Sequence, residues 1–435
     1  MPTYQETIDY LFSRLPMFSR IGAAAYKADL TNTIKLCEFI GNPHLRFKSI
    51  HIAGTNGKGS VSHMLAAILQ TAGYKTGLYT SPHLKDFRER IKINGEMVSE
   101  DFVTGFTERI KPLITEIEPS FFEITVAMAF SWFALQKVDV AVIEVGLGGR
   151  LDSTNIITPE LSVITNISYD HMNMLGNTLQ QIAGEKAGII KKGIPVVVGE
   201  TVPETKLVFV QKAKDNEAEI YFANEKKWVA DWTQEKHDLI ATIVDNHTDE
   251  RKDYTLDLGG LYQTKNLLTV LEAVDVLVKQ KWQINEKHIE KALKEVKKLT
   301  GLHGRWEVVH QNPYTVFDVG HNEDGIKQIN EQLEHCDFQK LHIVTGMVKD
   351  KEVSKILSLF PKYATYYFTK AQIPRALPEH ELAEKAKEIG LAGQPFATVN
   401  QALQQAIDHA HKEDMILVCG SVFVVGEVEV NQLKW

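Results

Sequence analysis

Residues 54–60, Gly-Thr-Asn-Gly-Lys-Gly-Ser, combine residue types that can bind phosphate. The alternation of apolar and polar residues at 47–53 predicts a strand before them, and apolar residues at helical spacing predict a helix at 61–70 after them. A glycine-rich turn between a strand and a helix directs several backbone N–H groups to one point, where the helix dipole also favours an anion. Lys58 can place an ammonium on the β- and γ-phosphates of a nucleotide. The predicted nucleotide-binding residues of this phosphate loop are Gly54, Thr55, Asn56, Gly57, Lys58, Gly59 and Ser60.

The phosphate loop departs from the general pattern at two positions. That pattern has a glycine five residues before Gly57, where this chain has Ile52, and a serine or threonine directly after the lysine. Here Gly59 follows Lys58, and Ser60 comes one position later. The alternative interpretation is a glycine-rich turn with an exposed lysine.

Two oxygen-bearing side chains follow predicted strands. Ser81 comes after a short strand at 75–80, and Glu144 lies near the end of an apolar strand at 138–145. A hydroxyl or carboxylate at the carboxyl end of a strand beside a phosphate loop can bind magnesium, and an unpaired buried carboxylate is costly. The alternatives are a Ser-Pro turn at Ser81 and a salt-bridged Glu144.

His171 and Lys186 are the other side chains that could take part in chemistry. His171 follows a buried strand predicted at 161–167 and stands next to Asp170. Lys186 lies in a small-residue, largely apolar helix predicted at 178–190 with Thr178 as its cap. Burial lowers the pKa of a lysine and makes a neutral, nucleophilic amine available. A structural histidine and a surface lysine are the alternatives.

The elements that position these residues form an α/β pattern. The length of 435 residues favours two domains, and 44% hydrophobic with 24% charged residues is ordinary for a globular protein. We expect a P-loop-type, mostly parallel ATPase domain at 1–298 and a linker at 299–304. A smaller doubly wound, Rossmann-like domain is expected at 305–435. The first domain includes a polar, antiparallel excursion at 226–258 and a helix at 286–298, and the second has strands at 314–319, 341–345, 365–369 and 415–419.

Composition also limits the partners. A formal charge of −8 without a dense Lys/Arg run argues against nucleic acid. The N-terminus lacks the pattern of a signal peptide, and no apolar run reaches membrane-spanning length. The three cysteines, Cys37, Cys336 and Cys419, are scattered as in proteins of a reducing compartment. We therefore expect a cytoplasmic monomer without nucleic-acid or membrane partners.

The phosphate loop, with its Gly-Ser ending, resembles that of the folylpolyglutamate synthase and dihydrofolate synthase branch of the Mur ligase superfamily. The resemblance runs in order through both expected domains, and it has one departure, because His303 stands where the family has a proline. The further matches are Ser81 and the segments Gly146–Asn155, Gly260–Asn266, Arg305–Trp306, Asp318–Asn322, Gly346–Lys351 and Gly420–Glu427.

The resemblance implies an ATP-dependent amide ligase that joins L-glutamate to dihydropteroate and to reduced folates through an acyl phosphate. ATP and Mg²⁺, at two sites, are the implied cofactors. In this family Ser81 and Glu144 would bind one magnesium. His171 and Lys186, the latter as a carbamate formed with carbon dioxide, would bind the second. The implied catalytic residues are thus Lys58, His171 and Lys186.

The same resemblance implies further binding residues. Asn266 would meet the nucleotide base, and Arg305 and Asp318 would reach ATP from the second domain. From the residues alone, Gln263 and Asn266 are helix-capping residues, while Asp152 could orient an amine or a pterin, with capping of the segment after it as the alternative. The segment 146–155 is no dinucleotide fingerprint, because Leu151 stands where the third glycine belongs. The implied substrate-binding residues are the loop at 21–27, Phe122, Glu123, Leu151, Asp152, Ser153, His321 and Ser421.

The sequence alone leaves three alternative functions open. The first is an enzyme that only extends folates, and the second is a muramyl-type ligase that adds an amino acid to a sugar-nucleotide peptide. The Gly59-Ser60 ending and the Phe122-Glu123 segment argue against the second. The third is a nucleotide-binding regulatory module without enzymatic activity, and the presence of Lys58, Glu144 and His171 together argues against it.

Overall fold

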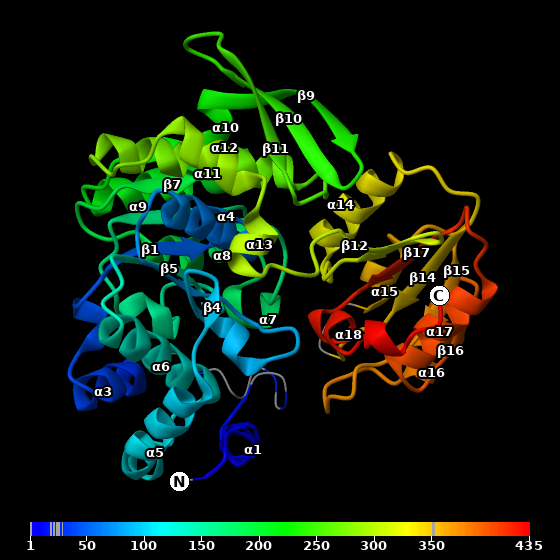
Figure 1. Cartoon of the computed structure of the whole chain (residues 1–435), viewed down its shortest axis with the longest axis horizontal. Helices are drawn as coiled ribbons and strands as arrows, with labels where there is room; N and C mark the ends of the chain where they lie inside the picture. The colour runs from blue at the N-terminus through cyan, green and yellow to red at the C-terminus, as the bar shows by residue number, and fades with distance from the viewer. Residues whose placement is uncertain (1, 18–19, 21, 23–26, 28, 350–352) are drawn as a thin grey trace. The chain divides into compact units, whose positions relative to one another are not determined.

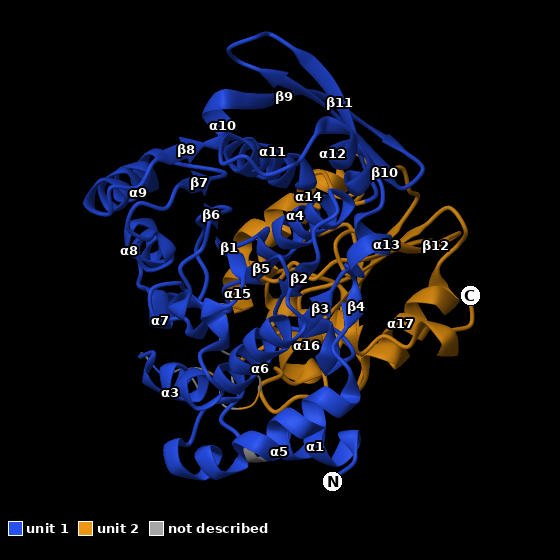
Figure 2. Ribbon diagram, turned by 60° about the vertical axis from the view of Figure 1, so that its left-hand side comes forward, with its two compact units in different colours: residues 1–18, 23–257, 262–302 blue, residues 19–22, 258–261, 303–435 orange. Residues whose placement is uncertain are grey.

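The chain divides into two compact units, shown in blue and orange in Figure 2. Unit 1 comprises residues 1–18, 23–257 and 262–302, and unit 2 comprises 19–22, 258–261 and 303–435. The computed structural model describes residues 2–17, 20, 22, 27, 29–349 and 353–435. The chain passes from unit 1 to unit 2 between Leu302 and His303, within the segment predicted as a linker. The limits 1–298 and 305–435 stay our proposal for the functional domains.

Unit 1 is built on an eight-stranded sheet with the order β4-β3-β2-β5-β1-β6-β7-β8 (Figure 1). All neighbours from β2 to β8 are parallel, and β3 and β4 continue the sheet antiparallel. The mostly parallel sheet predicted from the sequence is confirmed. Its strands are β1 (Lys48–Ala53), β2 (Thr76–Tyr79), β3 (Ile91–Ile93), β4 (Glu96–Met97), β5 (Val140–Glu144), β6 (Leu161–Ile164), β7 (Val196–Val198) and β8 (Ile220–Phe222).

Helices cover both faces of this sheet. The helix after the phosphate loop, α4, packs against β1, β2 and β5, and α11 packs against β6 and β7. The helices of unit 1 are α1 (Tyr4–Arg14), α3 (Thr31–Phe39), α4 (Lys58–Thr71), α5 (Glu100–Ile117), α6 (Phe121–Leu135), α7 (Met172–Leu175), α8 (Leu179–Lys186), α9 (Pro203–Asp215), α10 (Ala223–Lys226), α11 (Gln263–Lys279), α12 (Glu286–Leu293) and α13 (Val296–Thr300). Short 3₁₀ turns are η2 (Pro43–Leu45), η3 (Phe87–Arg90), η4 (Ser153–Ile156) and η5 (Ala187–Ile189).

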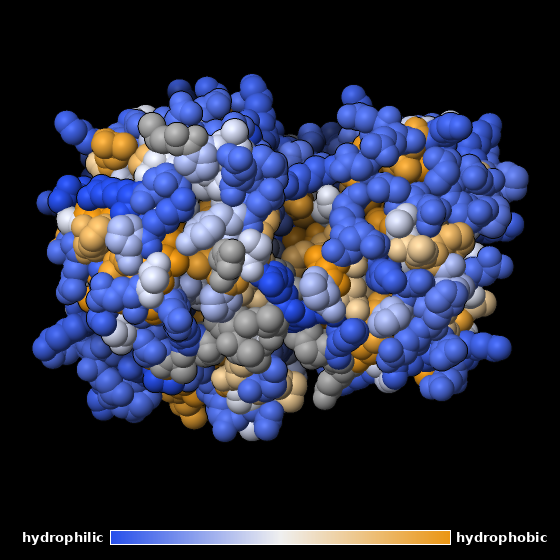
Figure 3. All heavy atoms as spheres, turned by 90° about the horizontal axis from the view of Figure 1, so that it is seen from below, coloured by the Kyte–Doolittle hydropathy of each residue, from blue (hydrophilic) through white to orange (hydrophobic). Residues whose placement is uncertain are grey.

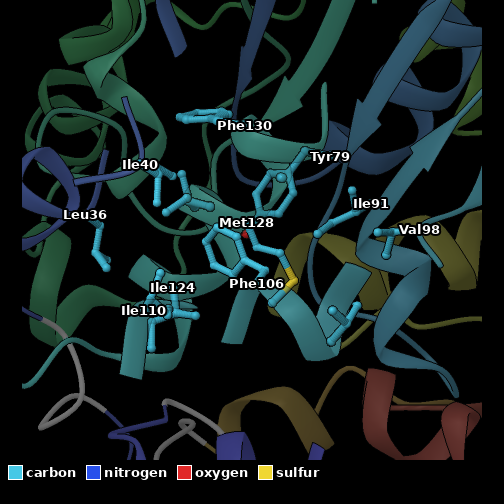
Figure 4. Packing of buried hydrophobic residues seen from close by; sticks show 14 of the residues in the cluster. Leu36, Ile40, Tyr79, Ile91, Val98, Phe106, Ile110, Ile124, Met128 and Phe130 are labelled. Carbon is cyan, nitrogen blue, oxygen red and sulfur yellow. The ribbon is translucent and has the colours of Figure 1, made fainter. Parts of the chain in front are cut away.

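The opposite face of the sheet packs against α3, α5 and α6. Alternate residues of β5, Ala141 and Ile143, face this core, as expected for a strand whose side chains alternate between two covered faces. Removing these apolar side chains from water is the main force that holds the helices on the sheet. Figure 4 shows the core side chains Leu36, Ile40, Tyr79, Ile91, Val98, Phe106, Ile110, Ile124, Met128 and Phe130.

The helix predicted at 286–298 is two helices in the structure, α12 and α13. Glu295 donates its N–H to Ala292 O, and its backbone leaves the helical region with φ −136°. A new helix starts there because Asp257, about forty positions earlier in the chain, accepts the N–H of Lys297 at 2.8 Å. Such a cap from a distant residue leaves no local signal in the sequence.

The antiparallel excursion predicted at 226–258 is confirmed. It forms a three-stranded sheet with the order β11-β10-β9, made of β9 (Lys227–Glu235), β10 (Asp238–Asp245) and β11 (Arg251–Leu256). Ion pairs fasten it to α11, where Asp275 lies 2.6 Å from the Lys226 ammonium and 2.5 Å from that of Lys227. The buried Glu272 lies one turn earlier on α11, 3.2 Å from Lys226.

Unit 2 contains a six-stranded sheet with the order β12-β13-β17-β14-β15-β16, parallel except for β12. α14, α15 and α16 contribute to the core on one face, while α17 packs against β14 and β15. The doubly wound α/β fold predicted for this part of the chain is confirmed. The elements are β12 (Glu307–Gln311), β13 (Tyr314–Phe317), α14 (Glu323–Leu333), β14 (Leu341–Thr345), α15 (Val353–Leu357), β15 (Thr365–Phe368), α16 (Glu379–Glu388), β16 (Gly393–Pro395), α17 (Val399–His409), β17 (Met415–Cys419), α18 (Val422–Gly426) and η6 (Val430–Gln432).

The surface is mainly hydrophilic on the face drawn in Figure 3, with hydrophobic side chains in separate areas. None of the described helices has both the length and the apolar composition that a membrane span needs. Many large apolar side chains are in the cores, where Phe130, Phe133 and Phe368 are fully buried.

Candidate active site

The phosphate loop joins β1 to α4 and depends on glycine at two positions. Gly54 has φ +149° and Gly57 has φ +82°, and α4 begins directly after Gly57. A Cβ atom on Gly54 would lie 1.8 Å from Thr165 Oγ1, and one on Gly57 would lie 2.3 Å from Asn266 Oδ1. Neither distance leaves room for a side chain, so the close approach of these residues requires glycine. The first N–H groups of α4 are thereby presented in the loop, as anion binding requires.

Residues after β6 hold the phosphate loop in place. Asn166 accepts the N–H of Asn56 on its side-chain oxygen at 2.8 Å and that of Thr55 on its carbonyl at 3.0 Å. The Thr165 hydroxyl donates to Asn56 O, and Ser168 N–H donates to the Thr55 hydroxyl at 3.1 Å. Because β1 and β6 are parallel neighbours, their carboxyl ends lie together. These three residues were not predicted from the sequence, where the signal for them is a polar Thr-Asn-x-Ser run after a buried strand.

Lys58 and Lys186 meet at one backbone oxygen. The Lys58 ammonium donates to Gly54 O at 3.1 Å and to Thr55 O at 3.0 Å, and the Lys186 ammonium donates to the same Gly54 O at 2.8 Å. Lys186 is 4% exposed. Its burial, reinforced by the neighbouring Lys58 charge, lowers the pKa of Lys186 to about 7. A substantial fraction of Lys186 is therefore a neutral amine near neutral pH, as the sequence predicted for a buried lysine.

Ser81 and Glu144 lie together because β2 and β5 are parallel neighbours. The N–H of Ser81 donates to Glu144 Oε2 at 3.0 Å, and Glu144 is buried. A serine hydroxyl and a carboxylate at one sheet edge are the oxygen ligands that magnesium prefers. Among the residues that the structure describes, no cluster of three His, Cys, Asp or Glu side chains could hold a metal ion. This donor set suits Mg²⁺, which protein carboxylates commonly share with substrate phosphates.

His171 caps the short helix α7 in a left-handed conformation, with φ +51°. Its Nε2 lies 3.8 Å from Asp170 Oδ2, and its N–H donates to Asp170 Oδ1 at 2.8 Å. The negative charge of Asp170 also acts on Lys186, where it opposes the lowering of the pKa. Asp170 and His171 thus lie on the side of unit 1 that carries Lys186.

The glycine-rich loop after β5 is organised by Asp152. One Asp152 oxygen accepts Leu147 N–H at 2.8 Å, and the other accepts the N–H of Thr154 at 3.0 Å and its hydroxyl at 2.6 Å. Asp152 is 3% exposed, and its burial raises the pKa of its carboxyl group. The capping role considered for Asp152 is confirmed, because it is the N-cap of η4. Its substrate-binding role stays a prediction, as do those of the half-buried Leu151 and the buried Ser153.

Phe122 and Glu123 stand at the start of α6 and face different surroundings. Glu123 is 2% exposed and accepts the N–H of Ser120 at 2.6 Å in a capping box. The ring of Phe122 fills the space beside Gly146, where an added Cβ would lie 2.4 Å from it. Phe122 therefore lines the glycine-rich loop, whereas Glu123 stabilises the helix end. The loop predicted at 21–27 lies mostly outside the described residues.

In unit 2, Arg305 and Asp318 belong to one folded turn. Asp318 is buried and accepts Trp306 N–H at 2.9 Å and Gly320 N–H at 2.7 Å. Val319 N–H donates to Gly304 O at 3.1 Å, which holds Arg305 next to the end of β13. Asp318 therefore fixes the backbone after Arg305, at Trp306, and the bond from Val319 fixes it before Arg305, at Gly304.

His321 and Ser421 lie on two loops that a backbone bond joins. Gly420 N–H donates to Gly320 O at 3.0 Å, so the loops after β13 and β17 lie side by side. The His321 ring, through Nδ1, bonds Val319 O at 2.9 Å. Ser421 caps α18 by accepting Phe423 N–H at 3.2 Å. The structure thus brings the two predicted substrate residues of unit 2 to the same sheet edge.

Gln263 connects the predicted base-binding residue to the phosphate loop. Its side chain is fully buried, donates to Ser60 Oγ at 3.1 Å and accepts from Asn266 Nδ2 at 2.8 Å. Asn266 in turn lies against Gly57. The sequence left both residues as possible helix caps, whereas in the structure Gln263 bonds Asn266 within α11 and Ser60 on the distant helix α4.

Comparison with known proteins identifies the family. Residues 52–274 match the Mur ligase middle domain, and residues 304–422 match the Mur ligase glutamate ligase domain. The dihydrofolate synthase/folylpolyglutamate synthase of Bacillus subtilis is 31% identical, and the alignment covers 98% of each chain. The chain belongs to the dihydrofolate synthase/folylpolyglutamate synthase family of Mur ligases.

Solved structures of this family have the same fold. Folylpolyglutamate synthase of Mycobacterium tuberculosis, complexed with ADP and AMPPCP, is 31% identical, with a TM-score of 0.83 over 92% of this chain and 94% of that one. Escherichia coli FolC in complex with DHPP and ADP is 28% identical, with a TM-score of 0.82 over 98% of this chain and 96% of that one. The family and the fold expected from the sequence are both confirmed.

Proposed function

We propose that this member of the dihydrofolate synthase/folylpolyglutamate synthase family is an ATP-dependent ligase that adds L-glutamate to dihydropteroate and to reduced folates. The observation that carries the proposal is the meeting of Lys58 and Lys186 at Gly54 O, on the sheet edge that also carries Glu144. One positive side chain lies on the phosphate loop, and the other is a buried amine with a pKa of about 7. The Bacillus subtilis relative, which is named for both activities, and the two relatives solved with ADP support it.

The reaction has two steps. The substrate carboxylate attacks the γ-phosphorus of ATP, which forms an acyl phosphate and releases ADP. The amine of L-glutamate then attacks the acyl carbon, the C–O bond to phosphate breaks, and an amide, phosphate and a proton result. Lys58 neutralises charge on the transferred phosphoryl group, and the N–H groups at the start of α4 hold its oxygens.

Ser81 and Glu144 would hold one Mg²⁺ beside the phosphates. The ion would supply charge neutralisation at the phosphoryl oxygens. For a second Mg²⁺ we propose His171 together with Lys186 as its carbamate. The carbamate forms when the neutral Lys186 amine attacks carbon dioxide, makes a C–N bond and releases a proton.

We assign the remaining residues by substrate. The nucleotide would be bound by the phosphate loop and by Asn266, Arg305 and Asp318. The pterin substrate would lie against Phe122, Glu123 and residues 151–153, and L-glutamate against His321 and Ser421. We propose that the enzyme acts in the cytoplasm as a monomer, without nucleic-acid or membrane partners.

Purified protein with labelled L-glutamate and ATP is expected to form product from both dihydropteroate and tetrahydrofolate. Product from tetrahydrofolate alone would reduce the assignment to a folylpolyglutamate synthase, and product from a muramyl peptide substrate instead would favour the muramyl-type alternative.

Phe122→Ala is expected to lower turnover of dihydropteroate more than that of tetrahydrofolate, because its ring lines the loop beside Gly146. Phe39→Ala, at a residue that is 47% exposed on α3, is the matched control.

Gln263→Met is expected to raise the KM for ATP about tenfold, because it removes both hydrogen bonds that hold Asn266 and Ser60 together in a buried site. The KM for the pterin substrate is expected to stay within about twofold of the original value. Gln280→Met, at the exposed end of the same helix, should change neither constant. Equal effects on both substrates would contradict a specific role at the nucleotide.

A further inference from the structure

His51 is a buried histidine that the proposed mechanism does not use. It lies on β1, three residues before the phosphate loop, and its side chain is completely buried. Its Nε2 lies 2.8 Å from Thr154 Oγ1 on η4, about a hundred residues further along the chain. Strand β1 thus makes a side-chain contact with the segment that follows the glycine-rich loop.

The direction of the bonds is determined by the Thr154 hydroxyl. This hydroxyl has one proton, which it donates to Asp152 Oδ1 at 2.6 Å. It must therefore accept a proton from His51, so that the His51 ring is protonated at Nε2. The other ring nitrogen, Nδ1, is buried and has no hydrogen-bond partner among the residues that the structure describes. Burial and the Lys191 charge lower the pKa of His51 to about 3, which keeps the ring neutral.

Asp152, at the end of this chain of bonds, holds the loop at 146–152. Its second oxygen accepts Leu147 N–H, so the carboxylate closes the loop from its first residues to its last. The closed loop contacts two proposed site residues. Gly146 lies against the Phe122 ring, and an added Cβ on Gly149 would lie 3.0 Å from Lys186 O. A displacement of Asp152 would therefore shift the loop against both Phe122 and Lys186.

We infer that His51 and Thr154 are positioning residues for the ligase reaction: the relay from His51 Nε2 through the Thr154 hydroxyl to Asp152 fixes the loop at 146–153 in the form that receives the pterin substrate. The identity of that substrate rests on the proposed function. Neither His51 nor Thr154 needs to contact the substrate in this role. Neutral His51 acts as a hydrogen-bond donor and exchanges no proton during the reaction.

A residue on the neighbouring strand provides a matched control. Ser162 lies opposite His51 in the register of β1 and β6. It is completely buried, and its hydroxyl donates to Ile189 O at 2.9 Å. Ser162→Ala and Thr154→Val each remove one buried hydroxyl from the same unit, but only the second interrupts the bonds to Asp152.

Thr154→Val is expected to raise the KM for the pterin substrate about tenfold, because it removes a hydrogen bond to a buried carboxylate. The KM for ATP should stay within about twofold. Thr154→Ser keeps the hydroxyl and should retain most of the original KM, and Ser162→Ala should change neither constant. A Thr154→Val enzyme with the kinetics of Ser162→Ala would overturn the inference, and so would an equal rise in both KM values.

Substitutions of His51 test the donor itself. Gln carries an N–H that can replace Nε2–H, so His51→Gln should retain the pterin KM, whereas His51→Leu should raise it as Thr154→Val does. The combined His51→Leu and Thr154→Val variant should be no worse than either alone, because both interrupt one relay. The pH dependence of kcat/KM should be the same in all of them, since His51 stays neutral. A change in the pH profile in His51→Gln would overturn the relay by assigning the ring a proton-transfer role.

Amide hydrogen exchange tests the relay without any assay of activity. In Thr154→Val the amides of Leu147 and Thr154, both bonded to Asp152, should exchange at least about tenfold faster, and in Ser162→Ala they should not. If Thr154→Val does not fold, His51→Leu serves for the same comparison. A wild-type protein that fails to ligate glutamate would contradict the proposed function, and the exchange result would still stand. Unchanged exchange in an enzyme that does ligate glutamate would contradict the relay alone.

Discussion

Lys58→Ala is expected to lower glutamate-dependent ATP hydrolysis by at least about 100-fold while the protein stays folded. The ammonium lies within the phosphate loop, 3.1 Å from Gly54 O and 3.0 Å from Thr55 O, so it is available to the phosphoryl oxygens. Charge builds up on these oxygens during transfer, and a fixed positive group there contributes most in the transition state. The loss should therefore be seen in kcat as well as in the KM for ATP. Phosphate release with and without L-glutamate is the measurement.

The folded state should survive Lys58→Ala because the loop is held by other residues. Asn166 and Thr165 bond its backbone, Ser168 N–H donates to the Thr55 hydroxyl, and none of these bonds involves the lysine side chain. Lys192→Ala is the control, since this lysine is exposed and forms an ion pair with the exposed Glu217 at 3.4 Å. It should keep the full rate. Near-normal turnover in folded Lys58→Ala would contradict the assignment of the phosphate loop.

The regular elements could be predicted where a local pattern determines them. Buried parallel strands such as β5 are continuous apolar runs, and the helix α6 has a capping box at Ser120 and Glu123. The strands β12 and β16 were not predicted, because they are short, partly exposed and of mixed composition. The division between α12 and α13 depends on Asp257, which is distant in sequence. Local pattern fails where a tertiary contact decides the structure.

The candidate site, like the fold, could be predicted from the sequence only in part. Glycines, a lysine and carboxylates at the ends of strands were predicted from their types and spacing, and the structure brings Lys58, Lys186 and Glu144 to one edge of a sheet. Residues that hold other site residues in position, including Asn166 and His51, were not predicted from the sequence. Their partners lie about a hundred positions away, so that only the packing of β1, β5 and β6 reveals them.

The second large effect concerns Lys186. Lys186→Ala is expected to lower turnover on the order of 100-fold, because it removes the anion that a carbamate would supply to the second magnesium. A short-chain carboxylate such as acetate should restore part of the activity by taking the place of the carbamate. Lys58→Ala serves as the control for this rescue, since a carboxylate cannot replace a missing ammonium. Rescue of both variants by acetate would point to a general salt effect.

The carbamate itself can be detected directly. Only the neutral amine attacks carbon dioxide, and burial with the Lys58 charge places the pKa of Lys186 at about 7. The modified fraction in ¹³C-labelled bicarbonate should therefore rise as the pH increases through 7, whereas an ordinary lysine would need a far higher pH. The remaining N–H of the carbamate can still donate to Gly54 O, which the Lys186 ammonium contacts at 2.8 Å. A bare amine in fully active enzyme at saturating bicarbonate would contradict the assignment, and the second magnesium would then need another anion.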